Sequence, residues 1–261
     1  MSVPVRDEYV DFCEGIRRLT QIDLLQYKRG QMERRIRSFA DRRGIKGLGD
    51  YLKSLQASGE ELDEFLDRVT INVSQLWRNP EQWKLLQDTL LPELARTRQV
   101  RAWSAGCSYG AEAHTLAAIC LEAASGARID IRGTDLDGRM VERARAGKFS
   151  RDDARSAPPL ALKKWFDEAD DGYQARPEIR KLLSFQVGDL LRGTFPAQAY
   201  DLVLCRNTVI YFTDDVRDDL HRRLADTIRP GGYLMIGSTE RVSRPAEIGL
   251  EPAYPFVYRK R

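Results

Sequence analysis

Residues 103–115, WSAGCSYGAEAHT, place two glycines and a carboxylate between an apolar run and a helix-forming run. The segment before them, QVRAW, is mostly apolar, and the segment after them, AEAHTLAAICLEAA, is rich in small residues. This pattern predicts a strand, a tight turn and a helix in succession. Such a unit is typical of the start of a nucleotide-binding α/β fold.

Three more short apolar runs, each closed by polar or glycine residues, follow this unit: IDIRGTD, YDLVLCRN and GGYLMIGS. Helical patterns lie between them, and strands that alternate with helices predict a parallel sheet with crossover connections. Between IDIRGTD and YDLVLCRN, a long mixed segment with the turn signal DDG predicts a small inserted β subdomain at about 167–187.

The first 70 residues have a helical pattern instead, including one long helix over 23–44. Within it, Met32, Ile36 and Phe39 recur at helical spacing and form one apolar stripe. We therefore expect a helical domain over 1–70, a linker over 71–80 that contributes to the ligand site, and an α/β domain over 81–261.

Composition excludes several classes of protein. The four cysteines lie far apart without a C-x-x-C pair, which argues against a zinc site and against a disulfide framework. No signal peptide and no run of about 18 apolar residues is present, so we expect a cytoplasmic protein that is not inserted in a membrane. The net charge of +3 is below that of a dedicated nucleic-acid binder, so no nucleic-acid partner is expected.

The ligand should lie outside the carboxyl ends of the strands, as in other open α/β sheets. The loop at Gly106 is neither a dinucleotide fingerprint nor a P-loop. Glu112, at the start of the helix, would repel a pyrophosphate and attract an ammonium or sulfonium group, although it also fits as an ordinary first-turn acid. Asp135 can accept hydrogen bonds from both hydroxyls of a ribose. A ribose, a positive centre and no phosphate together indicate S-adenosylmethionine, with no metal.

The chain resembles the CheR family of chemotaxis protein methyltransferases, which methylate glutamate side chains of bacterial chemoreceptors. The motifs that carry the resemblance are YKRGQMERRIRSFADRRG, TINVSQLWRN, WSAGCSYGAE, GTDLD, CRNTVIYF and PGGYLMIGSTE. The resemblance implies a Rossmann-like S-adenosylmethionine-dependent methyltransferase domain, S-adenosylhomocysteine as product, and the cytoplasmic helical domain of chemoreceptors as partner.

The resemblance also implies site residues. The implied cofactor contacts are Asn72, Ser74, Arg78, Gly106, Glu112, Asp135, Asp189, Leu190, Arg206 and Asn207. Arg78 and Tyr211 are the catalytic candidates that would aim the substrate carboxylate. The glycine loop departs from the family pattern, with Tyr109 and His114 in place of threonine and tyrosine. The inserted segment lacks the Gly-x-Gly loop with which some members bind a receptor tether, so we expect a tether-independent enzyme.

The basic segment at 17–46 holds ten Lys or Arg against three acidic residues. Lys28, Arg35 and Arg42 recur every seven residues along one helix face, which suits docking on a glutamate-rich receptor helix, although a solubilising surface is the alternative. The basic segment also favours an RNA or DNA methyltransferase. However, the sequence lacks the N/D-P-P-Y/F motif with which enzymes that methylate amino groups of nucleic acids usually hold the target amino group. A regulator that binds cofactor or receptor without turnover is a third hypothesis.

Overall fold

The computed structural model of the protein describes residues 7–69 and 74–261. The chain divides into two units. The first contains residues 1–72 and 211–217, and the second contains residues 73–210 and 218–261. None of the described helices is both long and apolar enough to cross a membrane.

The first unit is helical. Its helices are α1 (Glu8–Thr20), the short η1 (Leu24–Gln26), α2 (Arg29–Arg42), α3 (Leu48–Ala57) and α4 (Gly59–Val69). Asp7 caps α1, because its side chain accepts the Tyr9 N–H at 3.1 Å. The predicted stripe of Met32, Ile36 and Phe39 is buried, which confirms the helical period of α2.

Aromatic rings fill the core of the first unit. Phe12 stacks on Tyr51 at a centroid distance of 5.8 Å, and Phe65 meets both rings edge-on. Phe39 contacts Phe65 from α2 at 6.5 Å. These rings come from four helices, so their burial holds the helical unit together.

The expected helix over 23–44 is interrupted at Tyr27, which is extended rather than helical. Tyr27 forms a bridge with Phe212, and the two rings lie 5.0 Å apart. The Lys28 N–H donates to Tyr211 O at 2.9 Å, and the Thr213 N–H donates to Gln26 O at 3.0 Å. The break arises because this backbone pairs with a segment almost 200 residues away, a tertiary contact that helical periodicity does not register.

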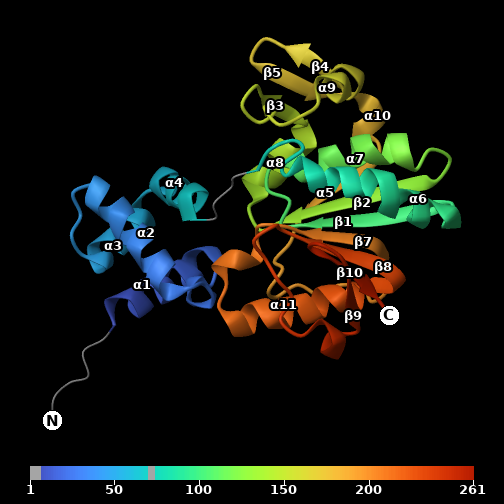
Figure 1. Ribbon diagram of the computed structural model, residues 1–261. Helices are drawn as coiled ribbons and strands as arrows, with labels where there is room; N and C mark the ends of the chain where they lie inside the picture. The colour runs from blue at the N-terminus through green and yellow to red at the C-terminus, as the bar shows by residue number, and fades with distance from the viewer. Residues whose placement is uncertain (1–6, 70–73) are drawn as a thin grey trace. The chain divides into compact units, whose positions relative to one another are not determined.

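A seven-stranded sheet in the order β6-β2-β1-β7-β8-β10-β9 forms the second unit, as Figure 1 shows. The strands are β1 (Gln99–Ala105), β2 (Arg128–Asp135), β6 (Leu183–Val187), β7 (Tyr200–Cys205), β8 (Ile228–Ile236), β9 (Leu250–Tyr254) and β10 (Val257–Lys260). The first five in spatial order are parallel, and β10 is antiparallel to both of its neighbours, β8 and β9. The predicted α/β class with a mostly parallel sheet is confirmed.

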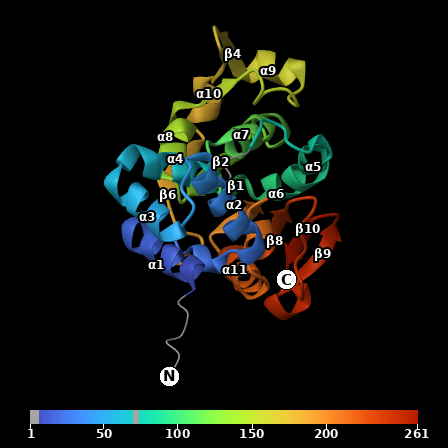
Figure 2. The same ribbon diagram turned by 90° about the vertical axis from the view of Figure 1, so that its left-hand side faces the viewer.

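Helices cover both faces of this sheet (Figures 1 and 2). On one face lie α5 (Pro80–Leu85), α6 (Leu91–Leu94), α7 (Ala111–Ala123) and α8 (Gly138–Ala146), and α11 (Asp214–Thr227) lies on the other. The small residues of α7 allow it to be buried almost all round, since ten of its residues are buried. The remaining short helical turns are η2 (Leu86–Leu90), η3 (Ala95–Thr97), η4 (Val209–Tyr211) and η5 (Pro245–Ile248).

The inserted subdomain has different boundaries from the expected 167–187. Its three-stranded sheet, in the order β3-β5-β4, consists of β3 (Lys148–Ser150), β5 (Gly172–Ala175) and β4 (Phe166–Ala169), with α9 (Pro159–Trp165) and α10 (Pro177–Arg180) beside it. The insertion therefore begins about twenty residues earlier. Residues 183–187 belong to the large sheet as β6, parallel to β2. Their assignment to the insertion is wrong because β6 is an edge strand with a single buried residue, Phe185, rather than an apolar run.

His114 packs inside the second unit. Its ring stacks on Phe185 at 5.6 Å and meets Phe149 edge-on at 5.0 Å. Its Nδ1 lies 2.8 Å from Gly110 O and donates to that carbonyl. Burial lowers the pKa of His114 to about 4, so the ring is neutral at physiological pH.

This burial predicts a pH-dependent stability. Below its ordinary pKa of 6.5 the unfolded chain protonates His114 while the folded protein does not, so the unfolded state binds more protons. The free energy of unfolding should therefore fall as the pH drops from 7 towards 4, by about 3 kcal/mol from this residue. Denaturant titrations of the parent and of His114→Phe at several pH values measure the effect. Parallel pH profiles for the two proteins would contradict it.

Candidate functional site

The carboxyl ends of β1, β2, β6 and β7 meet at one edge of the large sheet, because these strands are parallel neighbours. The loop after β1 is tied to β2, since the N–H groups of Gly106 and Cys107 both donate to Thr134 O at 2.9 Å. Gly106 has φ +77°, and a Cβ there would lie 2.7 Å from Thr208 Oγ1. Only glycine fits this turn without strain, so the loop can run close to the neighbouring strand end.

Asp135 closes β2 and faces this loop. Its Oδ2 accepts the Ser108 N–H at 2.7 Å, and its Oδ1 accepts the Asp137 N–H at 3.0 Å. Burial raises the pKa of Asp135, and the two N–H donors oppose that rise. Each oxygen keeps a second lone pair, so the carboxylate can still accept a pair of ligand hydroxyls.

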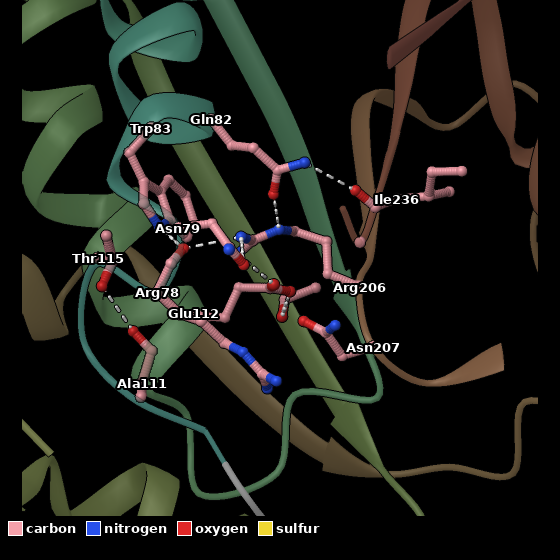
Figure 3. Close-up of polar contacts among 12 residues, drawn as sticks. Arg78, Asn79, Gln82, Trp83, Ala111, Glu112, Thr115, Arg206, Asn207 and Ile236 are labelled. Carbon is pink, nitrogen blue, oxygen red and sulfur yellow. Dashed lines mark hydrogen bonds and ion pairs between the residues drawn. The ribbon is translucent and has the colours of Figure 1, made fainter. Parts of the chain in front are cut away.

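Glu112 and Arg206 form a buried ion pair between the start of α7 and the end of β7 (Figure 3). Glu112 Oε2 lies 3.2 Å from Arg206 Nη1, and Glu112 Oε1 accepts the Ser104 hydroxyl at 2.8 Å. The Arg206 side chain is 2% exposed. Two opposite charges thus lie side by side at the strand ends.

Arg206 makes further hydrogen bonds to the segment that precedes β1 (Figure 3). Its Nε donates to Gln82 Oε1 at 2.8 Å, and its Nη2 donates to Arg78 O at 2.8 Å. The guanidinium also lies over the Trp83 ring at 4.9 Å, and the Trp83 indole N–H donates to Arg78 O. Burial lowers the pKa of Arg206, but an arginine that also faces Glu112 stays charged at neutral pH.

Sequence reasoning missed four residues of this network: Asn79, Gln82, Trp83 and Ser104. Gln82 also donates to Ile236 O at 3.1 Å, so it joins β8 to Arg206. A signal was available in the sequence, since Asn79, the last residue of the motif SQLWRN, and Pro80 start a helix. Gln82 and Trp83 lie on the first turn of that helix, where they can reach the strand ends.

The other expected cofactor residues of the second unit also lie at strand ends. Asp189 follows β6 and folds the next turn, because its Oδ1 accepts the Leu191 N–H at 2.7 Å. Leu190 is 8% exposed. Asn207 follows Arg206 and has φ +58°, a left-handed conformation that asparagine tolerates better than most residues.

The linker residues lie partly within the described chain. Asn72 lies outside the described residues. Ser74 O accepts the Tyr109 hydroxyl, which also lies 2.8 Å from Asp153 Oδ1. Arg78 contributes its carbonyl oxygen to the Arg206 network, and in Figure 3 its side chain extends away from the Arg206 guanidinium.

Tyr211 and the residues predicted for receptor docking lie in the first unit, whereas Arg78 belongs to the second. Tyr211, Lys28 and Arg35 line one cavity of about 440 Å³, together with Tyr27, Gln31, Met32, Arg34, Ser38 and Phe39. Arg42 does not line this cavity. Its guanidinium lies over the Phe39 ring at 4.9 Å, and its Nε donates to Ser38 O.

The cations at the start of α2 and along it differ in their ion pairing. Arg29 pairs with Asp7 and Glu33, and Arg37 pairs with Glu33 and Glu8. By contrast, the cavity cations Lys28, Arg34 and Arg35 form no ion pair with any described residue. The lining of this cavity thus contains three cations and no acidic residue.

Metal ligation has no counterpart in the described part of the chain, where no group of three or more His, Cys, Asp or Glu side chains could hold an ion. The strand-end site instead combines the Glu112–Arg206 pair of opposite charges, the Asp135 carboxylate with free lone pairs, and the apolar Leu190. Such a set fits a ligand that carries both a zwitterion and a diol.

Comparison with known proteins identifies the family. Residues 72–251 match the CheR methyltransferase SAM binding domain, and residues 7–70 match the CheR methyltransferase all-alpha domain. Chemotaxis protein methyltransferases of Listeria innocua and Listeria monocytogenes are 36% and 34% identical to this chain over 100% of both lengths. Chemotaxis protein methyltransferase 1 of Pseudomonas aeruginosa is 31% identical over 80% of this chain and 81% of that protein. The chain therefore belongs to the CheR family of S-adenosylmethionine-dependent methyltransferases.

Proposed function

We propose that the protein transfers the methyl group of S-adenosylmethionine to glutamate side-chain carboxylates of chemoreceptors, giving glutamate methyl esters and S-adenosylhomocysteine. The observation that carries the cofactor part is the Glu112–Arg206 pair beside Asp135. The observation that carries the substrate part is the cationic cavity beside Tyr211. The family supplies the link between these two features and a chemotaxis receptor.

The amino-acid end of S-adenosylmethionine is a zwitterion, and the buried pair matches it. Its ammonium would lie against Glu112 and its carboxylate against Arg206, so both charges keep a partner when water leaves. Asp135 would accept the two ribose hydroxyls. Leu190 offers an apolar contact for the adenine. Asn72, Ser74, Gly106, Asp189 and Asn207 complete the proposed cofactor contacts.

Bound S-adenosylmethionine supplies an electrophilic methyl group on a sulfonium. A glutamate side chain has an ordinary pKa near 4.3 and is already an anion at neutral pH, so the chain needs no general base. Its residues must instead hold the attacking oxygen about 3–3.5 Å from the methyl carbon and in line with sulfur. Tyr211 would orient the carboxylate through its hydroxyl. A bidentate arginine would quench the nucleophile, so we assign Arg78 to a single glancing contact or to the cofactor.

The receptor would meet the first unit at the cavity cations. Lys28, Arg34 and Arg35 lack acidic partners among the described residues, which is the arrangement expected of a surface that receives an external acid. Arg42 would extend this surface by one helical turn. A glutamate-rich receptor helix provides the complementary charge.

A receptor tether is not required in this proposal. The β4–β5 hairpin turns through Asp170 and Asp171, both exposed, in place of a Gly-x-Gly loop. The hairpin also carries Asp167 and Glu168, which are paired with Arg176 and Arg151. This acidic tip would repel an acidic peptide, and Gly172, which follows it, already packs against the backbone of Phe149.

The reaction class has a direct test. Receptor-containing membranes incubated with the protein and with S-adenosylmethionine labelled in its methyl group should yield labelled receptor that releases methanol in mild alkali. The release is expected because a carboxylate ester hydrolyses in base, whereas an N-methyl group does not. Alkali-stable label on RNA or DNA would contradict the proposal and favour a nucleic-acid methyltransferase. Cofactor binding without any transfer would favour a non-catalytic regulator.

The docking surface has a matched pair of variants. Lys28→Glu/Arg35→Glu reverses two cavity cations, and Arg18→Glu/Lys46→Glu makes the same charge change at exposed residues of the first unit outside the cavity. Arg42 is left in place because it packs on Phe39. The cavity variant should methylate receptors at least about tenfold more slowly at low ionic strength, with unchanged cofactor affinity, and the difference should shrink in salt. Equal rates for the two variants would place docking elsewhere.

A further inference from the structure

Glu240 is a buried carboxylate that no step above uses. It follows β8 in the turn Gly237–Glu240, which the Glu240 N–H closes by donating to Gly237 O at 3.0 Å, and the residue is 6% exposed. Among the described residues no cation pairs with it. A buried carboxylate needs hydrogen-bond donors in place of water. The donors that Glu240 binds therefore show which part of the chain it stabilises.

The partners of Glu240 are backbone amides of the segment that follows β7. Its Oε2 accepts the Asn207 N–H at 3.0 Å, and its Oε1 accepts the Val209 N–H at 3.1 Å. Oε2 also accepts the Gly237 N–H at 2.6 Å, and the Ile210 N–H contributes as well. Three of these four amides belong to one short segment thirty residues away in the sequence. Glu240 is thus a clamp on that segment.

The clamp acts on a residue whose backbone is in the left-handed region. Asn207 has φ +58°, and it directly follows Arg206. An L-residue in this conformation persists only when its surroundings fix it. If Glu240 released these N–H groups, that of Val209 would be a buried donor without an acceptor, and that of Asn207 a partly buried one. The carboxylate therefore determines the path of the chain beyond Arg206.

Gly237 gives an independent indication of the contact between Glu240 and Asn207. A Cβ at this position would lie 2.7 Å from Glu240 Oε2 and 2.9 Å from Asn207 N. The backbone of Gly237 is not in the left-handed region, so the requirement for glycine here is one of space. The space is taken up by the contact between the Glu240 carboxylate and the Asn207 amide.

We propose that Glu240 is a positioning residue of the cofactor site, which sets Asn207 and the segment after β7 in the conformation that S-adenosylmethionine and S-adenosylhomocysteine bind. The proposal rests on the proposed function in placing Asn207 at the cofactor. A glutamine of the same size cannot replace it, because its NH₂ group is a donor and would face the backbone donors. Burial raises the pKa of Glu240, and the N–H donors oppose that rise by favouring the ionised form.

Asp201 provides a matched control. It is another buried carboxylate, 5% exposed, near the opposite end of β7. It also accepts a backbone N–H, that of Arg101 at 2.7 Å, and it pairs with Arg229. Asp201→Asn therefore perturbs another buried carboxylate, in the strand that leads to Arg206, without touching the segment after Arg206.

The test compares Glu240→Gln with Asp201→Asn in the full chain by two measurements. Without cofactor, hydrogen exchange at the Asn207 and Val209 amides should be at least tenfold faster in Glu240→Gln and within twofold of the parent in Asp201→Asn. Calorimetry with S-adenosylhomocysteine should show a Kd at least tenfold higher in Glu240→Gln only. Equal protection and equal Kd in a folded Glu240→Gln would overturn the proposal. A Kd raised as much in Asp201→Asn would overturn it too, because the effect would then be general destabilisation.

If Glu240→Gln does not fold, Gly237→Ala tests the same proposal, because the added methyl group displaces the Glu240 carboxylate without removing it. It should speed exchange of the same amides and raise the Kd, and parental values would overturn the proposal. The parent protein separates the two hypotheses. A parent that binds no S-adenosylhomocysteine would refute the cofactor assignment itself, whereas a parent that binds it while Glu240→Gln binds equally well would refute only the role of Glu240.

Discussion

The buried ion pair between Arg206 and Glu112 is the interaction on which the strand-end site depends. Removing two charges from water costs several kcal/mol per ion, and their attraction offsets this only when the remaining hydrogen-bonding groups are satisfied. Here Gln82 Oε1 and Arg78 O accept further hydrogen bonds from the Arg206 guanidinium, and the Ser104 hydroxyl donates a hydrogen bond to the second oxygen of Glu112. Removal of either charge alone should therefore cost about 3–5 kcal/mol.

This pair also explains how distant segments form one site. Arg206 comes from the end of β7, Glu112 from the first turn of α7, and Gln82 from α5 before the sheet begins. Each of these segments contributes a proposed cofactor residue or lies next to one. The segment from Arg78 to Gln82, the glycine loop and the end of β7 are consequently held together, so a ligand with two opposite charges would find both partners already in place.

The alternation of strands and helices was sufficient to predict the sheet class, and the rule that ligands lie at carboxyl strand ends predicted that Glu112 and Asp135 would lie at adjacent strand ends. The network around Arg206 could not be predicted in this way, because the contact with Gln82 depends on how α5 packs on the sheet.

Contacts between segments remote in sequence also explain why the helix expected over 23–44 is broken at Tyr27, whose partner is Phe212. β6 was missed because half-exposed edge strands lack an apolar run. Likewise, the charge count of α2 indicated a basic face, but only the structure separates Lys28 and Arg35 from the paired Arg29 and Arg37.

The central claim is that the Glu112–Arg206 pair recognises the amino-acid end of the cofactor. Calorimetry with S-adenosylhomocysteine and with 5′-methylthioadenosine, which has the same nucleoside but no amino acid, isolates that contribution. Two charge-assisted contacts should make the parent bind S-adenosylhomocysteine about 100-fold or more tightly than 5′-methylthioadenosine. In a folded Glu112→Gln variant this ratio should fall at least about tenfold, while affinity for 5′-methylthioadenosine changes little. Equal affinity of the parent for both ligands, or an unchanged ratio in the variant, would contradict the account.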